Sequence, residues 1–182
     1  GIVAMPGVGF DVVPTDCLAA YVCAKLPNAT ELVLAFAGDG GMSRGTAATM
    51  AESLGLPGKI RRNGAIIDVP PIHVTRDVDF GAGGTRTCGA IPWGDVSTAY
   101  YSTGVGNIMT MMAMPLSMRL GAKASGLMGG LLQTGAAQKW LKDSVHKRIH
   151  GPSEGRRKRT STYIWGQATA ADGTSAAARL IT

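Results

Sequence analysis

The stretch Ala65–Ala90, AIIDVPPIHVTRDVDFGAGGTRTCGA, decides the fold class. It contains three β-rich segments, 65–69, 74–80 and 85–90, which prolines and glycines separate. Their alternation of apolar and polar residues with period two, together with these turn residues, predicts three consecutive strands. Strands joined by short turns pair in antiparallel fashion, whereas parallel strands need a long crossover between them. We therefore expect a largely antiparallel sheet around this stretch.

The sequence on either side alternates helical and strand patterns. Pro14 is suited to a first helical turn and Pro27 ends that helix, while Ser43 caps a second helix that Gly55 stops. The fold class that we expect is α+β, with a mixed, largely antiparallel sheet covered on one face by helices, in one domain over residues 1–182. The remaining expected elements are strands 1–5, 30–37, 108–114, 160–168 and 176–181, a helix at 95–102, and a helical segment 115–149 broken near 129–130.

The positive charge of the chain is confined to one segment. The net charge is +6, and the segment 139–159 alone holds eight Lys or Arg residues against Asp143 and Glu154. A nucleic-acid-binding domain spreads its cations over a face, so this local placement argues against a nucleic-acid partner. The segment has two open interpretations: a solvated helix and loop, or a contact with an acidic or membrane surface.

Cysteine usage and apolar runs exclude several classes of protein. Three Cys without C-x-x-C spacing fit a reducing compartment, so we expect a cytoplasmic protein. No H-E-x-x-H or zinc-type spacing occurs, so no metal site is expected. The longest apolar region, 108–137, is interrupted by Arg119, Lys123 and glycines, and is not expected to span a membrane.

Two glycine-rich turns resemble nucleotide motifs without completing them. Gly7-Val8-Gly9 begins like a dinucleotide fingerprint, but Phe10 and Asp11 follow and the third glycine is absent. The segment 40–46 has the two glycines of a P-loop, but Thr46 stands where the lysine belongs. Ser43, Arg44 and Thr46 offer donors for a carboxylate or phosphate at a helix N-terminus. The alternative is a simple capped helix start.

The densest polar and aromatic stretch lies at 91–103. Trp93, Asp95, Thr98 and Tyr100 fall within it and are candidates for the lining of a substrate pocket. Asp95 or Tyr100 is then the proton donor or acceptor. The alternative is that Asp95 caps a helix while the aromatic side chains pack in the core.

Four motifs in a fixed order resemble the saccharopine dehydrogenase-like oxidoreductases, a group that includes the trans-acting enoyl reductases. They extend over about 100 residues, and Gly151-Pro152 and Trp165-Gly166 fit the same pattern. In this chain the four motifs read GFDVVPTD (9–16), SRGTA (43–47), VDFG (78–81) and IPWGDVSTAYYSTG (91–104).

The resemblance implies a two-part protein. In that family an N-terminal Rossmann domain binds NAD or NADP, and an α+β domain contacts a small-molecule substrate and pairs subunits. Residues 1–9 are then the exit from a Rossmann domain that lies outside this sequence, and the family's chain continues beyond the point that matches Thr182. We expect a homodimer, no cofactor bound to this fragment, and no activity from it alone.

The resemblance also implies candidate residues for each role. Asp95 and Tyr100 are the catalytic candidates, and Arg44 is a candidate for holding a substrate carboxylate. The substrate-binding candidates are Asp11, Asp16, Ser43, Arg44, Thr46, Trp93 and Thr98.

A second hypothesis is a non-catalytic interaction domain that uses the segment 139–159. This segment lies next to five methionines that are expected at a contact surface: Met111, Met112, Met114, Met118 and Met128.

Overall fold

The computed structural model describes residues 1–4, 7–148, 151, 153, 155 and 159–182. Part of the basic segment, including Arg156, Arg157 and Lys158, lies outside the described residues. The helices are α1 (Val13–Lys25), α2 (Arg44–Ser53), α3 (Asp95–Thr103), α4 (Leu116–Leu127), α5 (Gly129–Leu132) and α6 (Gly135–Arg148), with a 3-10 turn η1 (Gly81–Gly83). The strands are β1 (Ala29–Gly38), β2 (Gly58–Arg62), β3 (Ala65–Val69), β4 (Thr75–Asp79), β5 (Thr85–Ile91), β6 (Asn107–Ala113), β7 (Thr162–Ala170) and β8 (Ser175–Ile181).

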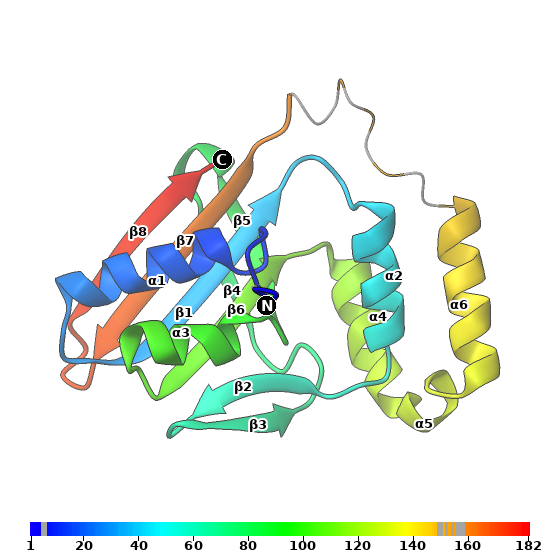
Figure 1. The fold of residues 1–182 in the computed structure, drawn as a ribbon, viewed down its shortest axis with the longest axis horizontal. Helices are drawn as coiled ribbons and strands as arrows, with labels where there is room; N and C mark the ends of the chain where they lie inside the picture. Colours follow the sequence, from blue (N-terminus) through cyan, green and yellow to red (C-terminus); the bar gives the residue numbers. More distant parts are fainter. Residues whose placement is uncertain (5–6, 149–150, 152, 154, 156–158) are drawn as a thin grey trace.

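The strands form one mixed sheet in the order β3-β2-β6-β1-β7-β8 (Figure 1). Strand β1 lies in its centre, parallel to β6 with Leu32 opposite Ile108, and antiparallel to β7 with Leu34 opposite Gly166. The β2–β3, β4–β5, β5–β6 and β7–β8 pairs are all antiparallel. The expected α+β class with a largely antiparallel sheet is confirmed.

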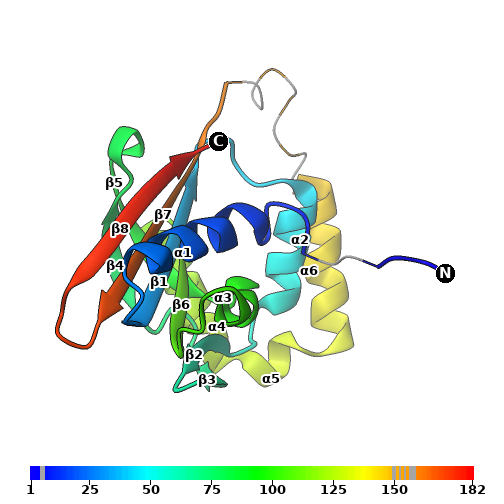
Figure 2. The ribbon, with the colours of Figure 1, turned by 60° about the vertical axis from the view of Figure 1, so that its left-hand side comes forward.

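Helices α1 and α3 cover one face of the sheet, as the sequence predicts (Figure 2). Alternate residues of β1, among them Leu32 and Leu34, point to this face and are buried under α1. A methyl group at Gly166 of β7 would lie 3.3 Å from Leu18 of α1. The helix therefore sits close to the sheet, and its apolar side chains fill the space that glycine leaves.

The β4–β5 hairpin covers the other face. Strand β5 pairs with the C-terminal half of β6, from Ile91 opposite Thr110 to Cys88 opposite Ala113, while β2 pairs with β6 at Ile108. This position brings apolar hairpin side chains onto β1, β6 and β7. The resulting core contains Ala35, Ala37, Val78, Phe80, Cys88, Met111 and Trp165.

Arginine side chains fasten this hairpin to the sheet. Arg179 of β8 donates to the Asp79 backbone at 2.8 Å and pairs with its carboxylate at 2.6 Å. Arg86 of β5 pairs with Asp39 at 2.7 Å, and this contact lowers the pKa of Asp39. Both ion pairs are substantially exposed, so each contributes little energy and mainly fixes the orientation of the hairpin.

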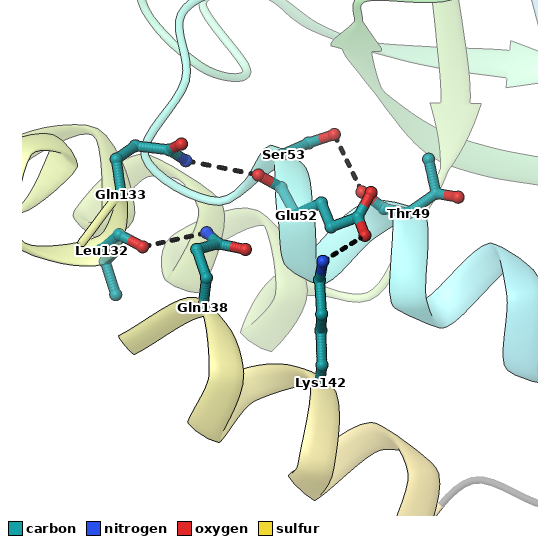
Figure 3. A network of polar contacts seen from close by, with 7 residues as sticks. All are labelled: Thr49, Glu52, Ser53, Leu132, Gln133, Gln138 and Lys142. Atoms are coloured by element: carbon teal, nitrogen blue, oxygen red, sulfur yellow. Dashed lines mark hydrogen bonds and ion pairs between the residues drawn. The ribbon is translucent and has the colours of Figure 1, made fainter. Parts of the chain in front are cut away.

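Helices α2, α4, α5 and α6 form a separate group beside the sheet (Figure 1). Polar contacts hold this group together (Figure 3): Gln133 donates to the Glu52 carbonyl at 3.2 Å and Lys142 pairs with the Glu52 carboxylate at 2.8 Å. The chain crosses itself closely where a methyl group at Gly55 would lie 2.9 Å from the Cα of Gly129. Within the described part of the chain, no helix is long and apolar enough to cross a membrane.

Three expectations about local structure are wrong. Residues 1–4 form no strand, and Ile2 and Val3 are exposed, because no strand of the described chain pairs with them. The expected strands do not include residues 58–62, where β2 forms. Met111 and Met114 are buried rather than at a contact surface, because they belong to β6 and to the residue that follows it.

Candidate functional site

The N-terminal turns of α1 and α3 meet at a pair of buried polar side chains. Thr15 of α1 and Asp95 of α3 are both fully buried, and the Thr15 hydroxyl donates to Asp95 Oδ2 at 2.8 Å. The same hydroxyl lies 3.0 Å from the Val12 carbonyl. A hydroxyl carries a single proton, so it cannot donate fully to both acceptors. A protonated Asp95 resolves this conflict, because it donates to Thr15 while Thr15 donates to Val12.

The electrostatics of the junction favour the neutral form of Asp95. Burial raises the pKa of Asp95 to about 7, the hydrogen bond from Thr15 opposes this shift, and the nearby Asp16 and Asp11 carboxylates reinforce it. Burial also raises the pKa of Asp11, against a backbone hydrogen bond from Gly94. The Asp95 carboxyl group, with a pKa of about 7, therefore exchanges its proton near neutral pH.

Several buried polar atoms around Asp95 lack a hydrogen-bond partner among the described residues. Asp95 Oδ1 is one of them, and Asp16 Oδ1, Trp93 Nε1 and Thr98 Oγ1 are the others at this junction. The second oxygen of Asp16 accepts from Ser102 at 2.6 Å. Buried polar atoms in folded proteins are normally satisfied, so these four are the atoms that a polar ligand or ordered water would serve.

Aromatic side chains line one side of this junction. The rings of Phe36 and Trp93 lie 4.8 Å apart, and Phe10 packs edge-on against Phe36 at 5.7 Å. A methyl group at Gly94 would collide with Val12 and lie 2.7 Å from Asp11 Oδ1. The loop 9–12 can therefore close over the start of α3 only because residue 94 is glycine.

The structure brings together five of the residues that the sequence singles out. Asp11, Asp16, Trp93, Asp95 and Thr98 all belong to this junction. They come from two motifs that are about 80 residues apart, and α1 and α3 bring them side by side. We call these five residues, together with Thr15, the Asp95 cluster.

Tyr100 does not join the Asp95 cluster. Its ring stacks on the Arg61 guanidinium at 4.3 Å, on the side of α3 that faces β2. Arg61 is itself buried and donates to the Val96 carbonyl at 2.9 Å. Tyr100 therefore contributes to packing between α3 and the sheet.

The start of α2 holds Ser43, Arg44 and Thr46. This helix takes no part in the hydrogen bonds that join Thr15 to Asp95 and Ser102 to Asp16. Ser43 accepts from the Thr46 backbone at 3.0 Å, and their hydroxyls lie 2.8 Å apart. These contacts are those of a capped helix start, the alternative that the sequence leaves open.

Sequence reasoning missed Thr15, Phe36 and Ser102 as parts of the junction. Thr15 has a recognisable signal, because it stands beside Asp16 in the first turn of a helix. Phe36 has none, since it is one apolar residue of a buried strand. Among the described residues, no group of three or more His, Cys, Asp or Glu side chains is placed to hold a metal ion.

The described residues do not form the βαβ unit with which a Rossmann fold holds a dinucleotide. The parallel strands β1 and β6 are joined through α2, two hairpins and α3, whereas a dinucleotide fold joins parallel neighbours through a single crossover helix. The glycine-rich turn after β1 leads into α2, whose first turn Ser43 already caps.

Comparisons with known proteins support the fold alone. No protein-family model matches the chain, and no curated protein does. Among solved structures, the chain is similar to an apo histidine-tagged saccharopine dehydrogenase (L-Glu forming) from Saccharomyces cerevisiae, with a TM-score of 0.51 and 10% sequence identity. The match covers 93% of this chain and 57% of the yeast chain. This chain therefore has a saccharopine dehydrogenase-like fold over nearly its whole length.

Proposed function

We propose that this chain is the substrate-binding and subunit-pairing domain of an NAD(P)-dependent, saccharopine dehydrogenase-like oxidoreductase. The observation that carries the proposal is the Asp95 cluster, in which a buried carboxyl group adjoins polar atoms that have no partner among the described residues. The saccharopine dehydrogenase-like fold motivates the choice of enzyme class in this proposal. The nicotinamide nucleotide would be held outside the described residues, by the Rossmann domain that the family resemblance implies.

In this proposal Asp95 exchanges a proton with the substrate. Its pKa of about 7 lets it act as acid or base at neutral pH. Asp16 Oδ1 and Thr98 Oγ1 would accept hydrogen bonds from a polar substrate, and Trp93 Nε1 would donate one. Because Asp95 is fully buried, the loop 9–12 would have to move to admit the substrate.

Subunit pairing is the second element of the proposal. Within the described residues, β3 and β8 end the path of the sheet and each has one neighbouring strand. Such edges carry unpaired backbone donors and acceptors that a second copy can satisfy. Analytical ultracentrifugation is expected to show a dimer at micromolar concentration. A monomer at high concentration would contradict the pairing role.

Calorimetric titration of the 182-residue chain with NADH and NADPH tests the location of the nucleotide site. No micromolar binding is expected. Micromolar binding would show that this domain carries its own nucleotide site and would refute the proposal. The reading frame upstream of Gly1 is expected to encode a G-x-G-x-x-G motif that opens a βαβ unit.

The role of Asp95 is tested in the protein encoded by that complete frame. Nicotinamide absorbance would be followed with aldehydes, keto acid and amine pairs, and enoyl thioesters as acceptors. Asp95→Asn is expected to lower kcat by about 10²-fold or more and to remove one limb of the pH profile. Asp68→Asn is the matched control, because Asp68 is an exposed carboxylate paired with Lys59. Equal pH profiles for the wild type and Asp95→Asn would leave Asp95 without a catalytic role.

A further inference from the structure

Large apolar side chains stand exposed along α4 and α5. Leu116 and Leu120 of α4 are more than half exposed, and Leu127 is 92% exposed. Their spacing of four and seven residues places them on one face of the helix, and Leu131 of α5 continues the exposed series. Soluble monomeric proteins rarely expose several large apolar side chains on one helix face unless that face binds a partner.

The same segment holds cations and no carboxylate. Residues 115–142 include Arg119, Lys123, Lys139 and Lys142, and neither Asp nor Glu. Lys142 pairs with Glu52 on the inner side of the helical group (Figure 3). Lys123 lies three residues after Leu120 and four before Leu127, which places it on the exposed apolar face. We call the surface formed by five of these residues the α4–α5 face: Leu116, Leu120, Lys123, Leu127 and Leu131.

An open apolar hollow lies beside the α4–α5 face. It has a volume of about 360 Å³ and is lined by apolar residues, including Leu56, Pro70, Pro71 and Gly126, together with Asp68, which pairs with Lys59. Gly126 precedes the exposed Leu127, and a methyl group on it would lie 3.0 Å from the Pro71 ring. The hollow and the leucines therefore form one continuous surface.

We propose that the α4–α5 face docks on the surface of a bilayer that contains anionic phospholipid. The leucines would enter the headgroup region, and Lys123 would extend its ammonium group to the lipid phosphates. Leucines and basic residues on one short helix, as on α4, are typical of helices that lie in a membrane interface. The absence of carboxylates from 115–142 makes the segment complementary to an anionic surface.

A second copy of this chain fits the α4–α5 face less well. A two-fold interface places the same patch on both sides, so Lys123 and Arg119 would face like charges with no carboxylate of 115–142 to pair with. Burying charges without partners is costly. A lipid headgroup layer supplies the counter-charge and an apolar phase together.

Vesicle flotation tests the proposal with phosphatidylcholine vesicles and with vesicles that also contain phosphatidylserine. Binding to the anionic vesicles is expected, with loss of binding at high salt. The double variant Leu127→Ser/Leu131→Ser is expected to bind roughly a hundredfold more weakly, from partial burial of each leucine. Lys123→Glu is expected to weaken binding by roughly 25-fold, for two units of charge near the surface.

Tyr101→Ser is the matched control, because Tyr101 of α3 is 82% exposed and lies outside the α4–α5 face. It is expected to bind vesicles as the wild type does, and circular dichroism checks that each variant is folded. The proposal is overturned if the wild type does not bind, if the leucine variant binds equally well, or if Tyr101→Ser loses binding. Dimerisation that the leucine variant abolishes, or binding to polyglutamate without binding to vesicles, would assign the face to a protein partner instead. None of these results depends on Asp95.

Discussion

The substitution Asp95→Asn is expected to flatten the pH dependence of the stability of the chain. The pKa of Asp95 is about 7 in the folded state, against 3.8 for an unperturbed aspartate. Because the folded-state value is the higher one, the neutral carboxyl group stabilises the fold fully below about pH 4. This contribution decreases as the pH rises toward 7. Above that value, the stability no longer changes with the ionisation of Asp95. Asparagine stays neutral throughout and imitates the protonated acid.

The size of the effect follows from the shift in pKa. One pKa unit corresponds to about 1.4 kcal/mol, so the full shift amounts to roughly 4 kcal/mol. Between pH 5 and pH 8 the wild type is expected to lose about 2–3 kcal/mol of unfolding free energy through this group. For a domain of this size, that loss lowers Tm by about 5–10 °C.

Urea denaturation at pH 5, 6, 7 and 8 measures the effect for the wild type and for Asp95→Asn. Burial and the nearby Arg62 lower the pKa of His73. The contribution of His73 to stability therefore rises with pH, opposite to that of Asp95, and it is the same in the wild type and in Asp95→Asn. The difference between the two slopes therefore isolates Asp95. Asp68→Asn, at an exposed ion pair, is expected to keep the wild-type slope. Parallel slopes for the wild type and Asp95→Asn would refute the argument that burial holds this carboxyl group neutral.

Three further substitutions test the packing around the Asp95 cluster and α3. Thr15→Val removes the hydroxyl that bonds Asp95, so thermal scans are expected to show a loss of about 1–3 kcal/mol that is larger at pH 8 than at pH 5. Gly94→Ala forces a methyl group onto Val12, so the urea midpoint is expected to fall by the equivalent of about 1–3 kcal/mol, and an unchanged midpoint would contradict the close approach. Arg61→Lys removes a planar donor that bonds the α3 backbone, so calorimetry is expected to show about 1–3 kcal/mol of destabilisation, whereas a neutral result would mean that these bonds contribute nothing.

The order and type of the elements were accessible from the sequence because the local signals agree with the final fold. Prolines and glycines mark the ends of β3, β4 and β5, and Ser43 and Gly55 mark the ends of α2. Pairing between distant strands was not accessible. No local pattern says that β1 lies between β6 and β7, or that the β4–β5 hairpin covers the second face. Those arrangements depend on how apolar faces from the whole chain fit together.

The Asp95 cluster shows the same division between local and distant information. Asp95, Thr98 and Ser102 recur at helical spacing, so they share the face of α3 that meets α1. Tyr100 lies five residues after Asp95, which turns it to another side of the helix. Helical periodicity alone therefore separates the two catalytic candidates. The contact between Asp95 and Thr15 joins residues 80 positions apart, and no spacing rule predicts it.

The central position of β1 bears on how the chain is synthesised. Its parallel neighbour β6 begins at Asn107, and its antiparallel neighbour β7 begins at Thr162. A nascent polypeptide therefore carries β1 without its two neighbouring strands until the ribosome has made the chain as far as β7, which ends at Ala170. Slow maturation and a need for chaperone protection during translation follow from this order, because long-range strand pairing delays folding and leaves apolar surface open to aggregation.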